Sequence, residues 1–267
     1  MSDIALSIRH VSKTFSPGTI NAKTVFKDLN LEVERGDFIT VIGSNGAGKS
    51  TMFGAISGSF YTDSGSVILN GHDITLVPEY RRSKYIGRLF QDPLKGTAPG
   101  LSIEDNLALA AARGPWLKMI HSSDKRAFRD RLALLGMGLE DRMNQPVGLL
   151  SGGQRQALTL LMATFNPPQL LLLDEHTAAL DPATAEKVLA LTTQIVADNH
   201  LTCMMVTHNM KDALTLGNRT LMMDNGSIIF DTRDEERSRL TVSDLLDKFR
   251  EAAGRALDND RMLLGNS

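Results

Sequence analysis

This sequence has a single cysteine, no large excess of positive or negative charge, and no long apolar run. Cys203 is the only cysteine, so no disulfide bond can form within the chain, and its apolar neighbours favour a small core residue. The formal net charge is -2, which provides no basic field to attract nucleic acid. Apolar runs stay far below the roughly 18 residues that a membrane-spanning helix needs, and the amino terminus lacks the pattern of a signal peptide. We therefore expect a soluble, cytoplasmic protein whose association with a membrane requires a partner.

Residues 43–50 form a glycine-rich stretch. This stretch follows the apolar, β-branched run 38–42, and residues 51–56 have the pattern of a helix. A strand, a glycine-rich loop and a helix start are typical of a phosphate-binding loop, because glycines let the backbone approach phosphate oxygens and a helix N-terminus attracts anions. Lys49 supplies a cation for the β- and γ-phosphates, and the Ser50 hydroxyl is placed to bind Mg²⁺. The alternative, a turn that binds nothing, is disfavoured by the flanking strand and helix. The predicted nucleotide contacts here are Gly43, Ser44, Asn45, Gly46, Ala47, Gly48, Lys49, Ser50 and Thr51.

Strand patterns dominate the first ninety residues, helical patterns fill the middle of the chain, and the two alternate after residue 170. This order predicts an α/β core that is interrupted by an inserted helical subdomain. We find no internal repeat, so we expect one nucleotide domain. The predicted strands are 5–11, 26–33, 38–42, 67–69, 86–90, 170–174, 201–206, 220–223 and 227–230, and the predicted helices are 51–56, 102–113, 123–135, 153–165, one from 182, 210–216 and one from 241.

Two carboxylates stand where the apolar run 170–174 ends. A buried strand would deliver Asp174 rigidly to the Mg²⁺ shell, whereas Glu175, one residue further, would face the attacking water. The alternative is a strand that ends in solvated acids, which is common in α/β proteins. The preceding phosphate-binding loop favours the first interpretation.

Residues 150–154 read Leu-Ser-Gly-Gly-Gln and directly precede a helical pattern. Small residues, a hydroxyl and the exposed N–H groups of a helix start predict a second site for a phosphate. The alternative is a glycine-rich loop that only caps the helix.

The stretch at 150–154 lies between the other two motifs in the chain. With this arrangement the sequence resembles the ATP-binding cassette (ABC) ATPases, whose signature is the stretch at 150–154. The resemblance covers residue 5 to about residue 231. It implies an α/β, P-loop NTPase (RecA-like) core with an antiparallel β subdomain and an inserted ABC-specific helical subdomain. The implied ATPase domain is 1–240, with core segments 1–91 and 160–240 and the helical subdomain at about 92–159, followed by a helical tail at 241–267.

The resemblance also implies roles for single residues. Phe15 matches an aromatic residue, usually Tyr, that stacks on adenine; Gln91 matches a glutamine that contacts Mg²⁺ and water. His208 matches a histidine that reaches the γ-phosphate, and Asp181 lies in a loop that crosses between subunits. His176 departs from the family, in which Pro, Ala or another small residue is frequent, and its imidazole would be near enough to tune Glu175. The implied catalytic residues are Glu175, His208 and Lys49, the Mg²⁺ ligands are Ser50, Gln91 and Asp174, and the further ATP contacts are Ser151, Gly152, Gly153 and Gln154. Roles without a ligand stay open for two of these residues: Phe15 as a core residue and Gln91 as a surface residue.

The family resemblance implies partners as well as ligands. Two copies would face head to tail, so that ATP lies between the phosphate loop of one and residues 151–154 of the other. A single cassette without a membrane span resembles the separate ATPase subunit of a bacterial importer. Such a subunit binds integral-membrane permease subunits through segment 91–102, on the cytoplasmic face of the membrane. It works with a periplasmic or extracellular substrate-binding protein, for an amino acid or another small solute. The alternative is a non-transport ABC ATPase such as an iron–sulfur cluster assembly factor.

Overall fold

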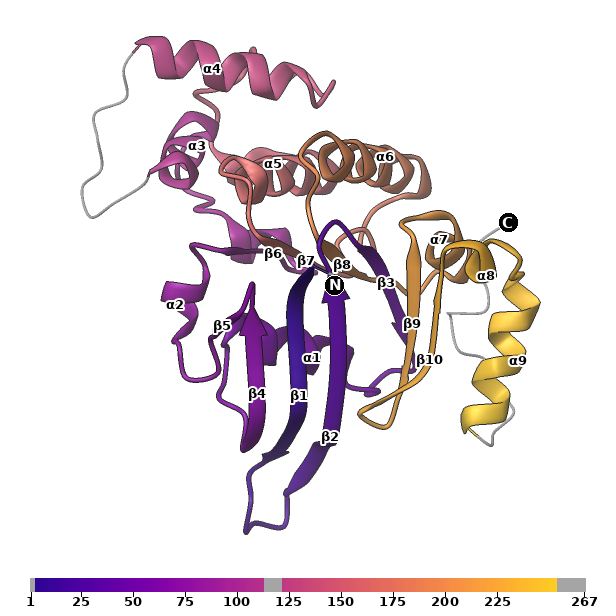
Figure 1. The fold of residues 1–267 in the computed structure, drawn as a ribbon. Coiled ribbons are helices and arrows are strands. Elements are labelled where there is room, and N and C mark those ends of the chain that lie inside the picture. The colour runs from indigo at the N-terminus through magenta and orange to yellow at the C-terminus, as the bar shows by residue number, and fades with distance from the viewer. Residues whose placement is uncertain (1–2, 113–121, 254–267) are drawn as a thin grey trace. The chain divides into compact units, whose positions relative to one another are not determined.

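The computed structural model describes residues 3–112 and 122–253, and contacts divide the chain into two compact units. The first unit has the spans Met1–Ile86, Gln169–Asp174 and His200–Ser267, and the second has Gly87–Pro168 and Glu175–Asn199. Figure 1 labels the helices and strands of both units. Asp174 and Glu175 are adjacent in the chain but fall in different units.

The first unit contains most of a parallel sheet. Strand β3 (Phe38–Gly43) pairs in parallel with β8 (Cys203–Val206) on one side and β9 (Arg219–Asp224) on the other, and β7 (Leu170–Asp174) pairs in parallel with β8. The antiparallel strand β10 (Ser227–Arg233) closes one edge, and β6 (Ile86–Leu89) ends the sheet order where the chain leaves this unit. Every residue of β3 and β7 is buried, which explains their unbroken apolar runs.

An antiparallel sheet forms the other layer of this unit. Its order is β2-β1-β4-β5, from β2 (Lys23–Glu34), β1 (Ile4–Phe15), β4 (Ser64–Leu69) and β5 (His72–Asp73). Inward residues of both sheets meet helix α1 (Lys49–Ser57) in one core, which includes Leu6, Phe26, Ile39, Met52 and Leu172. The predicted α/β core with an antiparallel β subdomain is confirmed.

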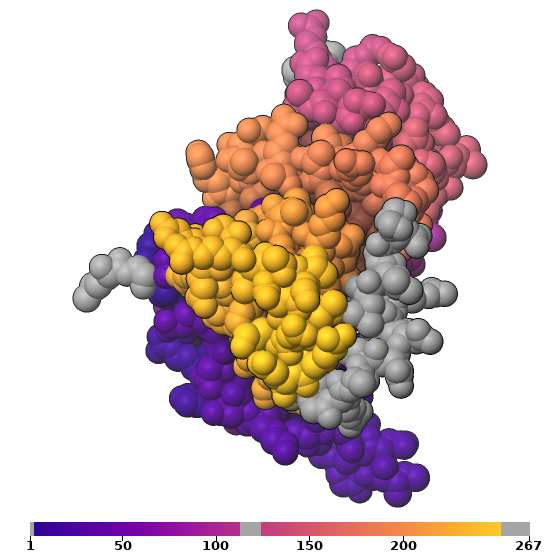
Figure 2. Space-filling model, turned by 90° about the vertical axis from the view of Figure 1, so that its right-hand side faces the viewer, coloured from indigo at the N-terminus to yellow at the C-terminus, as the bar shows by residue number. Residues whose placement is uncertain are grey.

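The carboxyl-terminal helices complete the first unit. Helix α9 (Val242–Ala253) is amphipathic and buries Leu245 and Phe249 against Ile42 and Met222. Figure 2 shows α9 in yellow on the surface, beside the orange segment that contains α7 (Met210–Thr215). Helix α8 (Asp234–Ser238) precedes it, and the short helix α2 (Glu79–Arg82) lies earlier in the chain. The predicted tail, 241–267, is therefore helical over 242–253, and residues 254–267 lie outside the described residues.

The second unit is helical. It contains α3 (Ile103–Ala111), α4 (Ser122–Ala133), α5 (Gly152–Thr164) and α6 (Pro182–Asp198), with single 3₁₀ turns at Pro93–Gly96 and Val147–Leu149. Ile103, Leu107, Phe128, Leu132 and Leu158 are buried in its core. All four helices were expected, but the predicted end of the first one, near residue 113, lies outside the described residues. Contacts group α6 with these helices, and the predicted extent of the subdomain, 92–159, stays a prediction.

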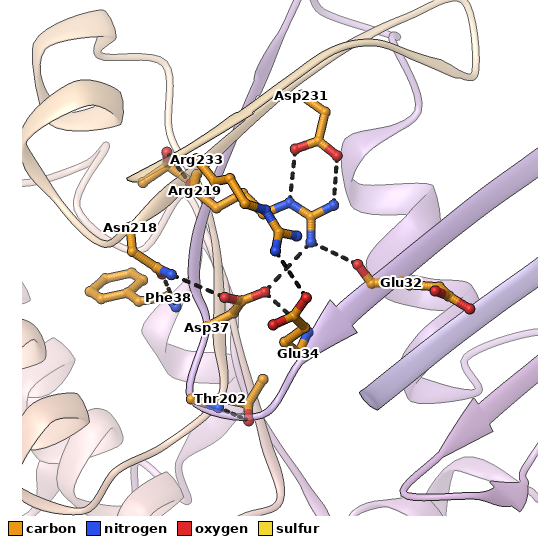
Figure 3. A network of polar contacts seen from close by, with 11 residues as sticks. Glu32, Glu34, Asp37, Phe38, Thr202, Asn218, Arg219, Asp231 and Arg233 are labelled. Atoms are coloured by element: carbon orange, nitrogen blue, oxygen red, sulfur yellow. Dashed lines mark hydrogen bonds and ion pairs between the residues drawn. The ribbon is translucent and has the colours of Figure 1, made fainter. Parts of the chain in front are cut away.

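A buried arginine fixes one end of the parallel sheet. Arg219 donates two hydrogen bonds to the carboxylate of Asp231, at 2.8 and 2.6 Å, and one to the carbonyl of Glu32 at 2.7 Å. Next to it, the Asn218 side chain accepts a hydrogen bond of 2.8 Å from the Phe38 N–H (Figure 3). A guanidinium can be buried here because these oxygens replace its water. The network secures the starts of β3 and β9, opposite the end at which β3 leads into the glycine-rich loop.

Candidate active site

Three strands of the first unit end at one edge of the sheet, and each delivers a predicted site residue. Val206 of β8 lies opposite Val41 of β3 and opposite Asp174 of β7. The glycine-rich loop therefore starts two residues after Val41. Asp174 lies beside Val206 in the sheet, and His208 follows two residues after Val206. Ligands of α/β proteins bind outside the carboxyl ends of such strands. The structure thus brings residues 43–51, Asp174 and His208 together.

The glycine-rich loop passes directly into helix α1. Gly48 is the residue before the helix, with φ at 105°, and no side chain among the described residues caps the first turn. The N–H groups of that turn therefore keep the capacity to bind an anion. Gly43 has a different reason to be glycine: a Cβ there would lie 2.2 Å from the carbonyl oxygen of Met223 on β9. Asn45, Gly46 and Ser50 are exposed, so the loop is open to a ligand.

Ser50 and Asp174 touch, although 124 residues separate them. The Ser50 hydroxyl donates a hydrogen bond of 3.0 Å to the Asp174 carboxylate. Hydroxyl and carboxylate oxygens are hard ligands of the kind that Mg²⁺ prefers, so this pair fits the predicted metal site. Lys49 is buried, and its ammonium donates to the carbonyls of Gly43 and Ser44 at 2.7 and 3.0 Å. A cation is thus held at the mouth of the loop.

The ring of Phe15 is held by two residues that are not among the predicted site residues. Phe60 packs edge-on against it with ring centroids 5.1 Å apart, and the Lys13 ammonium lies 5.5 Å from each ring centroid. Lys13 is fixed by an ion pair of 2.8 Å with Asp63. Phe15 is 36% exposed, which leaves part of the ring available for stacking on a base. The alternation of β1, which puts Lys13 and Phe15 on one face, was the only signal for Lys13; nothing pointed to Phe60.

The signature residues form the start of α5 in the second unit. The Ser151 hydroxyl accepts a hydrogen bond of 3.3 Å from the Gln154 N–H, and the Gln154 side chain accepts one of 3.2 Å from the Ser151 N–H. This reciprocal cap fixes the loop before the helix. A Cβ on Gly153 would lie 2.0 Å from Thr184 of α6, so this glycine lets two helices approach closely. Ser151 and Gly152 are exposed.

The remaining predicted residues also belong to the second unit. Gln91 is exposed and follows β6, and Asp181 caps α6 by accepting a hydrogen bond of 3.0 Å from the Thr184 N–H. Hydrogen bonds from Thr184 hold the pKa of Asp181 below its usual value. The roles assigned to Gln91, Glu175, Asp181 and residues 151–154 in ATP binding remain predictions.

Glu175 is followed by a buried histidine. His176 is 3% exposed, and its Nε2 atom lies 3.1 Å from the Thr192 hydroxyl of α6. That hydroxyl gives its own proton to the Val188 carbonyl at 2.8 Å, so the imidazole must be the donor in the contact with Thr192. Burial lowers the pKa of His176 to about 4, and the ring is therefore neutral at pH 7.

The pKa of His176 predicts how stability changes with pH. The folded-state pKa of about 4 lies below the ordinary 6.5, so only the unfolded chain takes up a proton between these values. Stability is complete above pH 6.5 and falls as the pH drops toward 4, by about 2 kcal/mol between roughly pH 7.5 and pH 5. Urea unfolding of the wild type and of His176→Gln at both pH values measures this term. Equal losses in the two proteins would contradict it.

Comparisons with known proteins agree with this geometry. The sequence profile of the family described as ABC transporter matches residues 26–178, more than half of the chain. The chain belongs to the ABC transporter family. It is 40% identical to a tyrosine transport ATP-binding protein of Clostridioides difficile, over 91% of this chain and 98% of that one. It is also 35% identical to the thiamine import ATP-binding protein ThiQ of Salmonella typhimurium, over 78% and 85% of the two chains.

Solved structures of ABC cassettes have the same fold. One is a dimeric, post-hydrolysis state of the ATP-binding cassette MJ0796 bound to ADP and phosphate. It matches with a TM-score of 0.74 at 26% identity, over 85% of this chain and 98% of that one. This ABC protein is therefore an ATP-binding ATPase. Among the helices that the structure describes, none has the length and apolar character to cross a membrane.

Proposed function

We propose that this ABC ATPase powers the import of an amino acid through a separate permease. The observation that carries the proposal is the 40% identity, over nearly the full length of both chains, to an ATP-binding protein of tyrosine transport. The name of the thiamine relative specifies import, but its match is shorter and less similar. We therefore assign the substrate class, an amino acid, from the longer and more similar match. The iron–sulfur assembly alternative gains no support from these relatives.

In the proposed mechanism, the residues of the first unit bind the triphosphate. The N–H groups of residues 46–50 and the Lys49 ammonium would contact the β- and γ-phosphates, and the exposed part of Phe15 would stack on adenine. Ser50 and Asp174 would hold Mg²⁺ with Gln91; the ion, when bound, neutralises phosphate charge. Support comes from the 3.0 Å contact between Ser50 and Asp174.

Hydrolysis then requires a base and charge stabilisation. Glu175 would accept a proton from the attacking water, a contribution of about 10²–10⁴-fold in rate. His208 and Lys49 would stabilise negative charge on the transferred phosphoryl group. Ser151 and the N–H groups of Gly152 and Gly153, from a second copy of the chain, would complete the site. The capped but exposed start of α5 supports this role, as does the dimeric state of the MJ0796 cassette.

The substrate is tested by transport. The chain, its permease and its binding protein are reconstituted in proteoliposomes, and uptake of labelled amino acids, tyrosine among them, and of labelled thiamine is measured with and without ATP. We expect ATP-dependent uptake of tyrosine or another amino acid, and none of thiamine. Thiamine uptake, or ATP hydrolysis without uptake of any amino acid, would contradict the proposed substrate class.

The permease contact predicts the effect of a charge on segment 91–102. Leu94 and Leu101 of this segment are 41% and 44% exposed. Leu94→Asp would place an unpaired carboxylate in an apolar interface, so we expect at least about a tenfold loss of affinity for the permease. The tagged chain is purified from solubilised membranes, and the permease retained is quantified by mass spectrometry. Leu134→Asp, at an exposed leucine outside the segment (74%), is the matched control and should retain it. Equal retention by both variants would exclude segment 91–102 as the contact.

A further inference from the structure

The backbone at Glu175 has an unusual conformation. Its φ is 48°, in the left-handed region of backbone conformation that residues other than glycine seldom adopt. Such conformations persist where the surrounding structure enforces them. If the enforcing contact were lost, the backbone would relax toward a commoner conformation and carry the carboxylate to a different direction. The chain therefore needs a contact that holds this residue.

His176 provides a contact at the very next position. Its ring is buried against the face of α6 on which Val188, Thr192 and Val196 form a buried stripe, one helical turn apart. The ring donates to the Thr192 hydroxyl at 3.1 Å, and Thr192 is itself tied to Val188 at 2.8 Å. Thr192 is therefore a fixed acceptor, because its one proton is already used by its own helix.

The segment after His176 is held at its other end as well. The Glu175 carbonyl accepts a hydrogen bond of 3.1 Å from the Ala178 N–H, and the Thr177 carbonyl accepts one of 3.1 Å from the Leu180 N–H. Asp181 then caps α6. Between these two ends, the His176 ring is joined to the body of α6 by its hydrogen bond of 3.1 Å to the Thr192 hydroxyl. This bond therefore connects the residue that follows Glu175 to the body of α6.

We propose that His176 is a positioning residue: by its hydrogen bond to Thr192 it holds Glu175 in the left-handed conformation that orients the carboxylate. This inference rests on the proposed role of Glu175 in hydrolysis. Alanine or proline at position 176 has no donor for Thr192, so this chain uses a side-chain anchor that relatives with those residues lack. The functional consequence is on the catalytic step and not on ATP binding, because His176 points into the helical unit and away from solvent.

The test is steady-state MgATP hydrolysis by the full chain in two pairs of variants. His176→Ala and Thr192→Val remove the donor and the acceptor, and His176→Gln and Thr192→Ser keep them. We expect the first pair to lose about tenfold in kcat with KM for ATP changed less than about twofold, because misplacement of a catalytic group slows the chemical step. The second pair should stay within about threefold of the wild type. The double variant His176→Ala/Thr192→Val should be no slower than either single variant, because the two substitutions remove the same hydrogen bond.

A loss of folded protein must be separated from a loss of positioning. The kcat is therefore calculated per nucleotide-binding site, counted by titration with a fluorescent ATP analogue, and thermal midpoints are measured beside it. Wild-type kcat in both Thr192→Val and His176→Ala overturns the proposal, and so does additivity in the double variant. Glu175→Gln is assayed in parallel. If it hydrolyses ATP at the wild-type rate, the role of Glu175 fails; if it is inactive while the His176 and Thr192 variants are unimpaired, only the positioning role fails.

Discussion

A Glu175→Gln chain is expected to bind MgATP with wild-type affinity and to hydrolyse it about 10²–10⁴-fold more slowly. The amide has the shape of the carboxylate but cannot accept a proton from water. It leaves Lys49 and the pair of Ser50 and Asp174 unchanged, so the contacts that bind the phosphates persist. Phosphate release and ATP affinity are measured on the same preparation, and a stalled ATP-bound dimer should accumulate in gel filtration.

The matched control for this substitution is Glu186→Gln. Glu186 is an exposed carboxylate on α6, so the same change of charge is made in the same unit without touching the residues assigned to ATP. We expect it to hydrolyse ATP at the wild-type rate. If Glu175→Gln were equally active, another group would have to be the base, and the first candidate would be His208 at the end of β8.

Local chemistry explains why much of the fold could be predicted. The strand, glycine loop and helix at 38–57 are contiguous in sequence, and Asn225 and Gly226 have φ of 45° and 77°, as a tight hairpin between β9 and β10 requires. Strand β1 was predicted to end near residue 11 but extends to Phe15. Its pairing with β2 shifts register between Ile8 and Val11, and this irregularity interrupts the alternation from which the strand was recognised.

What the sequence could not show are contacts between residues far apart in the chain. The partner of Phe15 is Phe60, and that of His176 is Thr192; neither position has a pattern that marks it. Gly43 and Gly153 were interpreted through phosphate binding or as parts of glycine-rich loops. The structure adds that each also allows close packing, against Met223 and Thr184 respectively. A glycine at a ligand site can therefore be required both for the ligand to approach and for close packing, and only the tertiary structure shows the second requirement.

Two inactive variants are expected to restore each other's activity when mixed. Lys49→Ala removes the cation of the phosphate loop, and Ser151→Arg fills the start of α5, so each chain alone should hydrolyse almost no ATP. If ATP is bound between two copies, a mixed dimer has one site with both defects and one site with neither. Random pairing makes half of the dimers mixed, so a 1:1 mixture that is allowed to exchange should regain about a quarter of the wild-type activity.

The control for this complementation places both defects in one chain. A Lys49→Ala/Ser151→Arg chain mixed 1:1 with the wild type gives mixed dimers in which each site has one defect. Only wild-type pairs remain active, so exchange should lower the activity of the wild-type chains by about half. Recovery in the first mixture and loss in the second distinguish a shared site from one that a single chain completes. If each chain held ATP entirely by itself, the first mixture would stay inactive and the second would lose nothing, and the proposed pairing of residues 43–51 with residues 151–154 of another copy would be wrong.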